Sequence, residues 1–210
     1  MVTDGLNPFT LLLFVGAVLG GGALLAAYVF ARVTGRQTLA KAALILGAGG
    51  VGVYLLLFVT ASITSRDRVL APGEEKHICE VDCHLAYSVA GVKTEPAPGG
   101  GGGTRYTVTV KVRFDEETIS NRRPKDLSLS PNSRYVALVD AEGRRYPGPT
   151  DGLRRRLLPG ESYTTDLVFD VPATAIGLHL VLRSADIETP FVIGHENSWF
   201  HGKTTFALGA

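Results

Sequence analysis

Sulfur-containing and indole side chains are scarce in this sequence, which has two Cys, one Met and one Trp among its 210 residues. So few of them argue against an aromatic stacking platform for single-stranded nucleic acid and against a Met-rich binding surface. A strong excess of charge is missing too, because residues 64–210 hold 18 of the 21 Lys and Arg and 19 of the 20 Asp and Glu. Nucleic-acid binding favours a basic surface, so we expect no nucleic-acid partner.

Charged residues are absent from two long stretches in the first third of the chain. Phe9–Ala31 is 23 residues without a charge, and Ala42–Ile63 is 22. At about 1.5 Å per helical residue each stretch reaches about 33–35 Å, enough to cross a hydrocarbon layer of about 30 Å. We therefore predict a transmembrane hairpin in residues 1–63, a juxtamembrane linker at 64–76 and an extracytoplasmic β-domain at 77–210.

The residues around these stretches predict how the hairpin is inserted. No Lys or Arg precedes Phe9, whereas a secretory signal peptide begins with a basic region and has a shorter apolar core. The first helix is therefore expected to be retained. The connector carries Arg32, Arg36 and Lys41, and basic connectors stay in the cytoplasm. We predict a multi-pass protein of the inner membrane with both chain ends outside, although residues 64–76 also hold basic side chains.

Both apolar stretches are rich in glycine. Gly16 and Gly20 are four residues apart, as are Ala48 and Gly52, and such pairs of small residues let membrane helices approach closely. Two interpretations stay open: the two helices pack on each other, or a small-residue face docks a second copy or another membrane protein. Residues 47–52 also match the G-x-G-x-x-G nucleotide fingerprint, but no strand and helix units follow as that site requires.

Beyond residue 69 the pattern becomes that of β-strands. In Tyr106–Phe114 the even positions are apolar and the odd positions are Thr, Lys and Arg, which predicts a strand with one buried face. In 134–141, Tyr135, Ala137 and Val139 share one face, and Arg145-Tyr146 is expected to begin the returning strand. Further strands are predicted at 84–92, 164–171, 178–183, 191–194 and 204–208, with Pro and Gly between them. Short strands at this spacing predict an antiparallel β-sandwich.

Residues 158–172 contain the patterns Pro159-Gly-Glu161 and Phe169-Asp-Val-Pro172. Together with the strand at 106–114 and the turn at 140–143, they resemble a domain-of-unknown-function family of bacterial exported proteins. That family is similar to the mycobacterial immunoprotective extracellular antigen. The resemblance covers about residues 80–208 and implies an immunoglobulin-like antiparallel β-sandwich in the bacterial envelope. It supplies no catalytic residues, and the two-helix anchor and the Cys segment depart from the family's pattern.

One short segment holds most of the reactive side chains. His77-Ile-Cys79-Glu-Val-Asp-Cys83-His84 contains both Cys and two of the five His. A disulfide between Cys79 and Cys83 suits an oxidising exterior. In one extended strand, however, residues i and i+4 lie about 13 Å apart, and a bridge needs Cα atoms within about 7 Å. The predicted disulfide therefore requires a turn through residues 80–82.

Three other interpretations of this segment stay open. In the first, the two Cys are buried or free thiols. In the second, they attach haem, although C-x3-C-H departs from the usual C-x-x-C-H. The third is a copper or zinc site with the ligands His77, Cys79, Cys83 and His84. Two helices ahead of a β-sandwich resemble cytochrome oxidase subunit two. Tyr87 and Ala90, however, stand where the copper motif of that family has His and Met.

Near the C-terminus, His195 and His201 flank Trp199-Phe200. These aromatic side chains either close the core of the domain or form an exposed patch that touches the membrane or a partner. No Ser-His-acid spacing or nucleophile elbow is present, so we predict no enzyme.

The sequence therefore predicts a non-catalytic membrane protein that presents an immunoglobulin-like domain for protein–protein interaction. Because the linker is short, the domain is expected close to the bilayer, with a membrane-protein partner or a second copy. One such role is that of an accessory subunit. The alternative is an envelope redox or metal protein that uses residues 77–84, and no cofactor is expected unless copper or zinc binds there.

Overall fold

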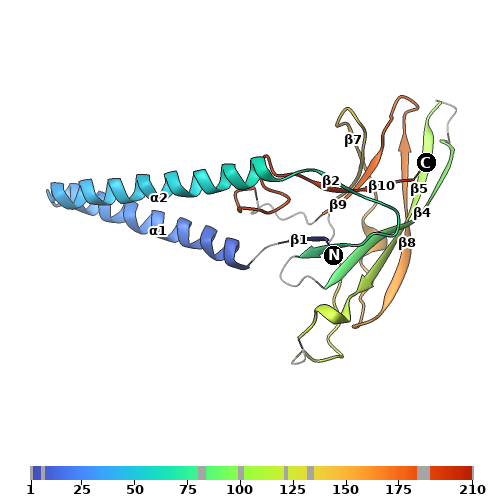
Figure 1. Cartoon of the computed structure of the whole chain (residues 1–210), viewed down its shortest axis with the longest axis horizontal. Coiled ribbons are helices and arrows are strands. Elements are labelled where there is room, and N and C mark those ends of the chain that lie inside the picture. Colours follow the sequence, from blue (N-terminus) through green and yellow to red (C-terminus); the bar gives the residue numbers. More distant parts are fainter. Residues whose placement is uncertain are drawn as a thin grey trace. The chain divides into compact units, whose positions relative to one another are not determined.

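The computed structural model describes residues 2–5, 8–79, 84–98, 102–120, 123–131, 135–183 and 190–209. The chain forms two compact units (Figure 1). The helix unit consists of Leu6–Arg66 and Ile187–Gly202, and the β unit consists of Met1–Gly5, Asp67–Asp186 and Lys203–Ala210. A segment from the C-terminal part of the chain thus belongs with the N-terminal helices.

The helix unit is built on α1, Pro8–Val33, and α2, Gln37–Thr64, which lie side by side (Figure 1). Both helices are long and apolar enough to cross a membrane, as predicted, and both extend past the predicted stretches. Gly35 makes the reversal between them at a φ of 71°, a left-handed conformation that glycine adopts without strain. At the end of α1, the Thr34 hydroxyl donates to the Phe30 carbonyl at 2.8 Å.

The helix glycines are mostly open. A Cβ added to Gly47 would meet Leu24 at 3.9 Å, whereas one added to Gly16, Gly20 or Gly52 would meet no atom of the described residues within 4 Å. Gly47 therefore faces α1 across the hairpin. The close approach that small residues allow is not used at Gly16, Gly20 or Gly52 within this chain.

The β unit contains two five-stranded sheets. In spatial order the first sheet is β1 (Val2–Gly5), β3 (Lys76–Cys79), β4 (Leu85–Pro96), β5 (Thr104–Phe114) and β8 (Ser162–Val171). The second is β2 (Arg68–Leu70), β10 (Thr204–Ala207), β9 (His179–Arg183), β6 (Tyr135–Val139) and β7 (Arg145–Pro147). β1 pairs with β3 and β2 with β10 in parallel, and the other pairings are antiparallel.

Both sheets contribute to one hydrophobic core. On β5, Val108, Val110, Val112 and Phe114 are fully buried, which confirms the alternation expected for that strand. Leu167, Phe169 and Val171 of β8, and Leu180 and Leu182 of β9, join the same cluster. Phe169 and Val171 belong to the pattern Phe169-Asp-Val-Pro172, so two residues of that pattern serve to pack the core.

Several details differ from the sequence expectations. Residues 191–194 form turns instead of a strand. On β6 the core side chains are Val136 and Leu138, on the face opposite to Tyr135, Ala137 and Val139. The short strands β2 and β3 were not predicted, and they lie partly within residues 64–76, the expected linker.

Trp199 and Phe200 do not close a core. Their side chains are 54% and 80% exposed, so of the two interpretations of this segment the structure favours the exposed patch.

Candidate functional site

The Cys segment connects two strands of the first sheet. β3 and β4 form an antiparallel hairpin in which Ile78 pairs with Leu85. The chain therefore reverses between these two residues, as the predicted disulfide requires. Residues 80–83 and the Cys79 side chain lie outside the described residues. The disulfide, thiol, haem and metal interpretations consequently all remain predictions.

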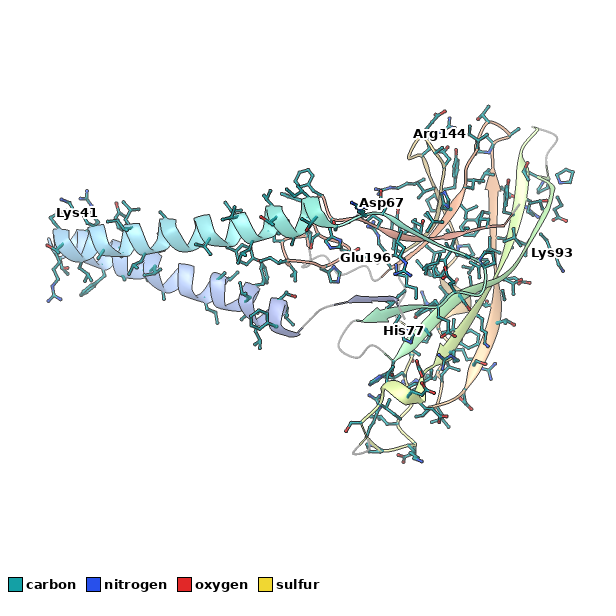
Figure 2. All side chains as sticks on the ribbon, viewed as in Figure 1. Lys41, Asp67, His77, Lys93, Arg144 and Glu196 are labelled. Carbon is teal, nitrogen blue, oxygen red and sulfur yellow. The ribbon has the colours of Figure 1, made fainter. Side chains whose placement is uncertain are left out.

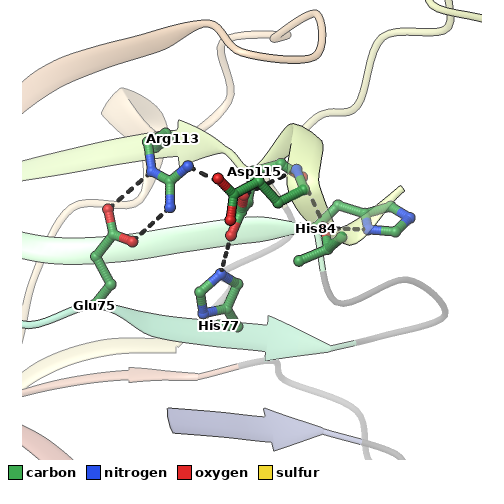
Figure 3. Close-up of polar contacts among 7 residues, drawn as sticks. Glu75, His77, His84, Arg113 and Asp115 are labelled. Carbon is green, nitrogen blue, oxygen red and sulfur yellow. Dashed lines mark hydrogen bonds and ion pairs between the residues drawn. The ribbon is translucent and has the colours of Figure 1, made fainter. Parts of the chain in front are cut away.

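Asp115, directly after β5, is the centre of a polar cluster beside this hairpin (Figure 3). Its Oδ2 lies 3.0 Å from Nε2 of His77, and its Oδ1 lies 3.2 Å from Nη1 of Arg113. Oδ1 also accepts the backbone N–H of Glu117 at 3.2 Å. The side chains of His77 and Asp115 are only 3% and 7% exposed, so this ion-pair geometry lies largely out of water.

The cluster holds both sides of the Cys segment. His77 is the first residue of the segment and lies on β3, and its ring meets the Asp115 side chain. His84 is the last residue of the segment, and its carbonyl accepts the Asp115 backbone N–H at 2.8 Å. Nδ1 of His84 lies 2.7 Å from the Thr118 hydroxyl, and its ring stacks on Phe114 with 5.9 Å between centroids. The end of β5 and the short 3-10 helix η1, Glu116–Thr118, thereby fix the two stems of the segment.

Glu75 adds a second carboxylate to the cluster. Its two oxygens accept Nε and Nη2 of Arg113 at 2.9 and 2.7 Å, a bidentate pair (Figure 3). Arg113 therefore bridges Glu75 and Asp115. A planar guanidinium suits such paired carboxylates better than a Lys ammonium would.

Charge pairing lowers the pKa of both carboxyl groups. For Glu75 the hydrogen bonds from Arg113 are the main cause of the lowered pKa, and they outweigh the opposing effect of burial. For Asp115 burial alone would raise the pKa, but hydrogen bonds from His77, Arg113 and the Glu117 amide together lower it. The same contacts raise the pKa of Arg113. The cluster is thus built for the ionised carboxylates.

The four predicted metal ligands are only partly placed. His77 and His84 engage different partners, Asp115 and Thr118, and the Cys79 side chain and Cys83 are outside the described residues. Within the described part of the chain, no group of three or more His, Cys, Asp or Glu side chains is arranged to hold a metal. His77 nevertheless has a buried Nδ1 that makes no hydrogen bond to any described residue.

A cavity of about 300 Å³ lies next to the cluster. Its lining consists of Glu116, Glu117, Ile119, Ser120, Arg123, Lys125 and Pro159. Side chains of both signs of charge line it.

The Pro159-Gly-Glu161 pattern borders this cavity and has a structural role. Gly160 adopts a φ of 82°, and its N–H donates to the Phe114 carbonyl at 3.1 Å. The Glu161 carboxylate accepts the Leu158 N–H at 2.8 Å. The pattern therefore makes the turn that leads into β8.

Sequence reasoning missed three members of this site. Arg113 was expected on the water-facing side of a strand and Glu75 within the linker, and Asp115 was not singled out, because the contacts Glu75–Arg113 and His77–Asp115 each join residues 38 positions apart. The one available signal is that Arg113 and Asp115 flank the last buried residue of a strongly alternating strand.

Lys76 was missed as well: it is fully buried, and its Nζ donates to the Leu182 and Thr204 carbonyls at 2.9 and 3.2 Å.

Replacing Asp115 by Asn tests whether this carboxylate stabilises the β unit. The change removes the charge that faces His77 and Arg113, so we expect the free energy of unfolding to fall by about 1–3 kcal/mol at neutral pH. Because the pKa of Asp115 is lowered in the fold, its stabilisation is present above the ordinary value of 3.8 and is lost as the pH falls through the lower folded value. The difference between the two proteins should therefore shrink under acid conditions.

The measurement is the midpoint of thermal unfolding of the full chain in detergent, monitored by the circular dichroism signal of β-sheet. The control is Asp170→Asn, which breaks the exposed ion pair with Arg105 and should change the midpoint little. Equal effects of the two substitutions at neutral pH would contradict the assigned role of Asp115.

Comparison with known proteins yields one distant likeness. No family model matches the chain, and no curated protein matches it. Among solved structures, the secreted protein MPT63 from Mycobacterium tuberculosis is similar, with 19% sequence identity and a TM-score of 0.35. The likeness covers 48% of this chain and 76% of that chain. It is distant and concerns less than half of the chain, so the fold described above rests on this protein's own strand pairings.

Proposed function

We propose that this protein is a non-catalytic, membrane-anchored protein that presents an extracytoplasmic β-domain and binds another protein of the same membrane. The single observation that carries the proposed membrane anchor is the apolar surface of α1 and α2. Leu12, Ile45 and Leu56 are 70%, 69% and 67% exposed, and they belong to helices whose sequences are mostly apolar. A bilayer removes such side chains from water, which favours insertion of the hairpin.

Charge and connectivity support the orientation. Arg32, Arg36 and Lys41 cluster around the connector of the hairpin, and such clusters favour the cytoplasmic side of an inner membrane. The other ends of the helices lead to the β unit, since β2 begins at Arg68, four residues after the last residue of α2. An immunoglobulin-like arrangement of the two sheets and membership of the exported family are part of this proposal.

The open glycines support a partner within the membrane. A larger side chain at Gly16 or Gly20 meets no described atom of this chain, so these positions are free to receive a helix of a second copy or of another protein.

A paired substitution tests this proposal. Gly16→Leu with Gly20→Leu should leave the hairpin folded, because the added atoms have space, but should block close approach of another helix. We expect the full chain to co-purify with a stoichiometric membrane protein or second copy in gentle detergent, and the double variant to recover it at least about tenfold less, a loss of about 1.4 kcal/mol.

The matched control is Val18→Leu, which enlarges an exposed side chain on the same helix and should leave recovery unchanged. A monomeric protein without any stoichiometric partner would contradict the proposed interaction.

A second candidate function is a metal or redox role for residues 77–84. The observation that favours it is the pair formed by Asp115 and His77. A carboxylate on one ring nitrogen of a His commonly orients the other nitrogen toward a metal, and the buried Nδ1 of His77 has no hydrogen-bond partner among the described residues. Copper or zinc would be held by His77, Cys79, Cys83 and His84.

Metal analysis of the purified chain, with a thiol count under denaturing conditions, separates the interpretations of the Cys segment. A metal role predicts one equivalent of copper or zinc that is lost in His77→Gln, whereas a disulfide predicts no metal and no titratable thiol. Two thiols without metal would contradict both.

A further inference from the structure

The segment Pro190–Gly202, here called the aromatic loop, is held against α2 at two points. The Tyr54 hydroxyl donates to the Phe191 carbonyl at 2.6 Å, and the Gly202 N–H donates to the Ser65 hydroxyl at 2.7 Å. Tyr54 lies three turns before the C-terminal end of α2, and Ser65 directly follows that helix, so the two points are separated by about 16 Å along it. Figure 2 shows Glu196 of the aromatic loop beside this end of α2.

The loop places its polar side chains inward and its aromatic side chains outward. His195, Glu196 and Ser198 are buried at 3%, 6% and 1% exposure. The exposed aromatics are Phe191, Trp199 and Phe200, at 47%, 54% and 80%. The rings of Phe191 and Trp199 pack against each other, with centroids 4.6 Å apart. This distribution is the reverse of that expected for a loop in water.

The backbone of Phe200 supports the same arrangement. It has a φ of 62°, a left-handed conformation that is unfavourable for a bulky residue. Such an outlier persists only where the surrounding contacts hold it, here with the side chain directed to the outside.

The helix geometry sets the depth of the loop in a bilayer. If the connector cations lie at one membrane face, Tyr54 is 13 residues from Lys41, or about 20 Å, and 18 residues from Arg36, or about 27 Å. In a hydrocarbon layer of about 30 Å, Tyr54 then lies about 3–10 Å inside the opposite face. That is the depth at which interfacial apolar side chains are buried, and Trp and Tyr concentrate there.

Several backbone N–H groups of the loop donate to carbonyls of the same loop. The Trp199 N–H donates to the Pro190 carbonyl at 3.0 Å, the His195 N–H to Val192 at 3.3 Å and the Ser198 N–H to His195 at 2.8 Å. The Ser198 hydroxyl donates to the Val192 carbonyl, and Tyr54 satisfies the Phe191 carbonyl. Irregular backbone near hydrocarbon is stable only when its polar groups are satisfied in this way.

We propose that the aromatic loop is a lipid-binding element: Phe191, Trp199 and Phe200 insert into the headgroup and acyl-chain boundary of the bilayer opposite the connector, at a depth set by Tyr54. This inference rests on the proposed membrane anchoring. It adds a second, non-helical contact with the same membrane, which restrains the chain between β9 and β10.

Trp199 is the only Trp of the chain, so its fluorescence reports on the loop directly. In phosphatidylcholine vesicles containing the full chain, its emission should be blue-shifted and only weakly quenched by aqueous acrylamide. Lipids brominated near the headgroup end of the acyl chain should quench it about twofold, and more strongly than lipids brominated near the chain end, as interfacial depth implies. Strong acrylamide quenching without bromolipid quenching would overturn the proposal, as would protection from both quenchers, which would indicate a covering protein.

Two further measurements keep the test specific. Tyr54→Phe removes the hydrogen bond to Phe191, so bromolipid quenching should decrease, whereas Tyr28→Phe removes a hydroxyl from the other helix and should not change it. Unchanged quenching in Tyr54→Phe would contradict the role of Tyr54.

Flotation of the vesicles after alkaline extraction tests the membrane anchor separately. A chain that floats but whose Trp199 is not quenched by bromolipid refutes the loop proposal alone, and a chain that does not float refutes the anchor.

Discussion

The apolar surface of α1 and α2 is the constraint on which the rest of the account depends. Two helices of 26 and 28 residues display large apolar side chains around most of their circumference. Removing such apolar surface from water is favourable by about 25 cal/mol per Å². In the proposed membrane anchor, a bilayer removes this surface from water. The connector cations, the exposed glycines and the aromatic loop then acquire defined environments, because each lies at a known residue spacing along the same helices.

A second constraint operates in both units, namely that polar groups removed from water need partners. In the β unit, Lys76 donates to carbonyls of β9 and β10, and Asp115 gathers His77 and Arg113 beside the Cys segment. In the helix unit, Tyr54 satisfies a carbonyl of the aromatic loop. These contacts fix the segments whose sequences are least regular. The Cys segment and the aromatic loop are both held in this way by long-range hydrogen bonds.

The sequence predicts well wherever one physical pattern dominates. Helix length and apolarity identify α1 and α2, and strict alternation identifies β5 and its buried face. Prediction fails where tertiary contacts override the pattern: β3 is short and carries a buried Lys76, and β6 buries the face that contains Val136 and Leu138. Residues 191–194 are apolar enough for a strand but form turns against α2. The Asp115 cluster joins residues 38 positions apart, a separation that periodicity does not report.

Site-directed labelling with a membrane-impermeant maleimide tests the central claim, a membrane hairpin with its connector on one face and the β unit on the other. Thr34→Cys places a thiol in the connector, and Glu142→Cys places one in the exposed turn before β7; each is compared with the unchanged chain. In intact spheroplasts the account predicts additional labelling at position 142 only, and at both positions after lysis. Labelling at position 34 in intact spheroplasts, or none at 142 before lysis, would contradict it.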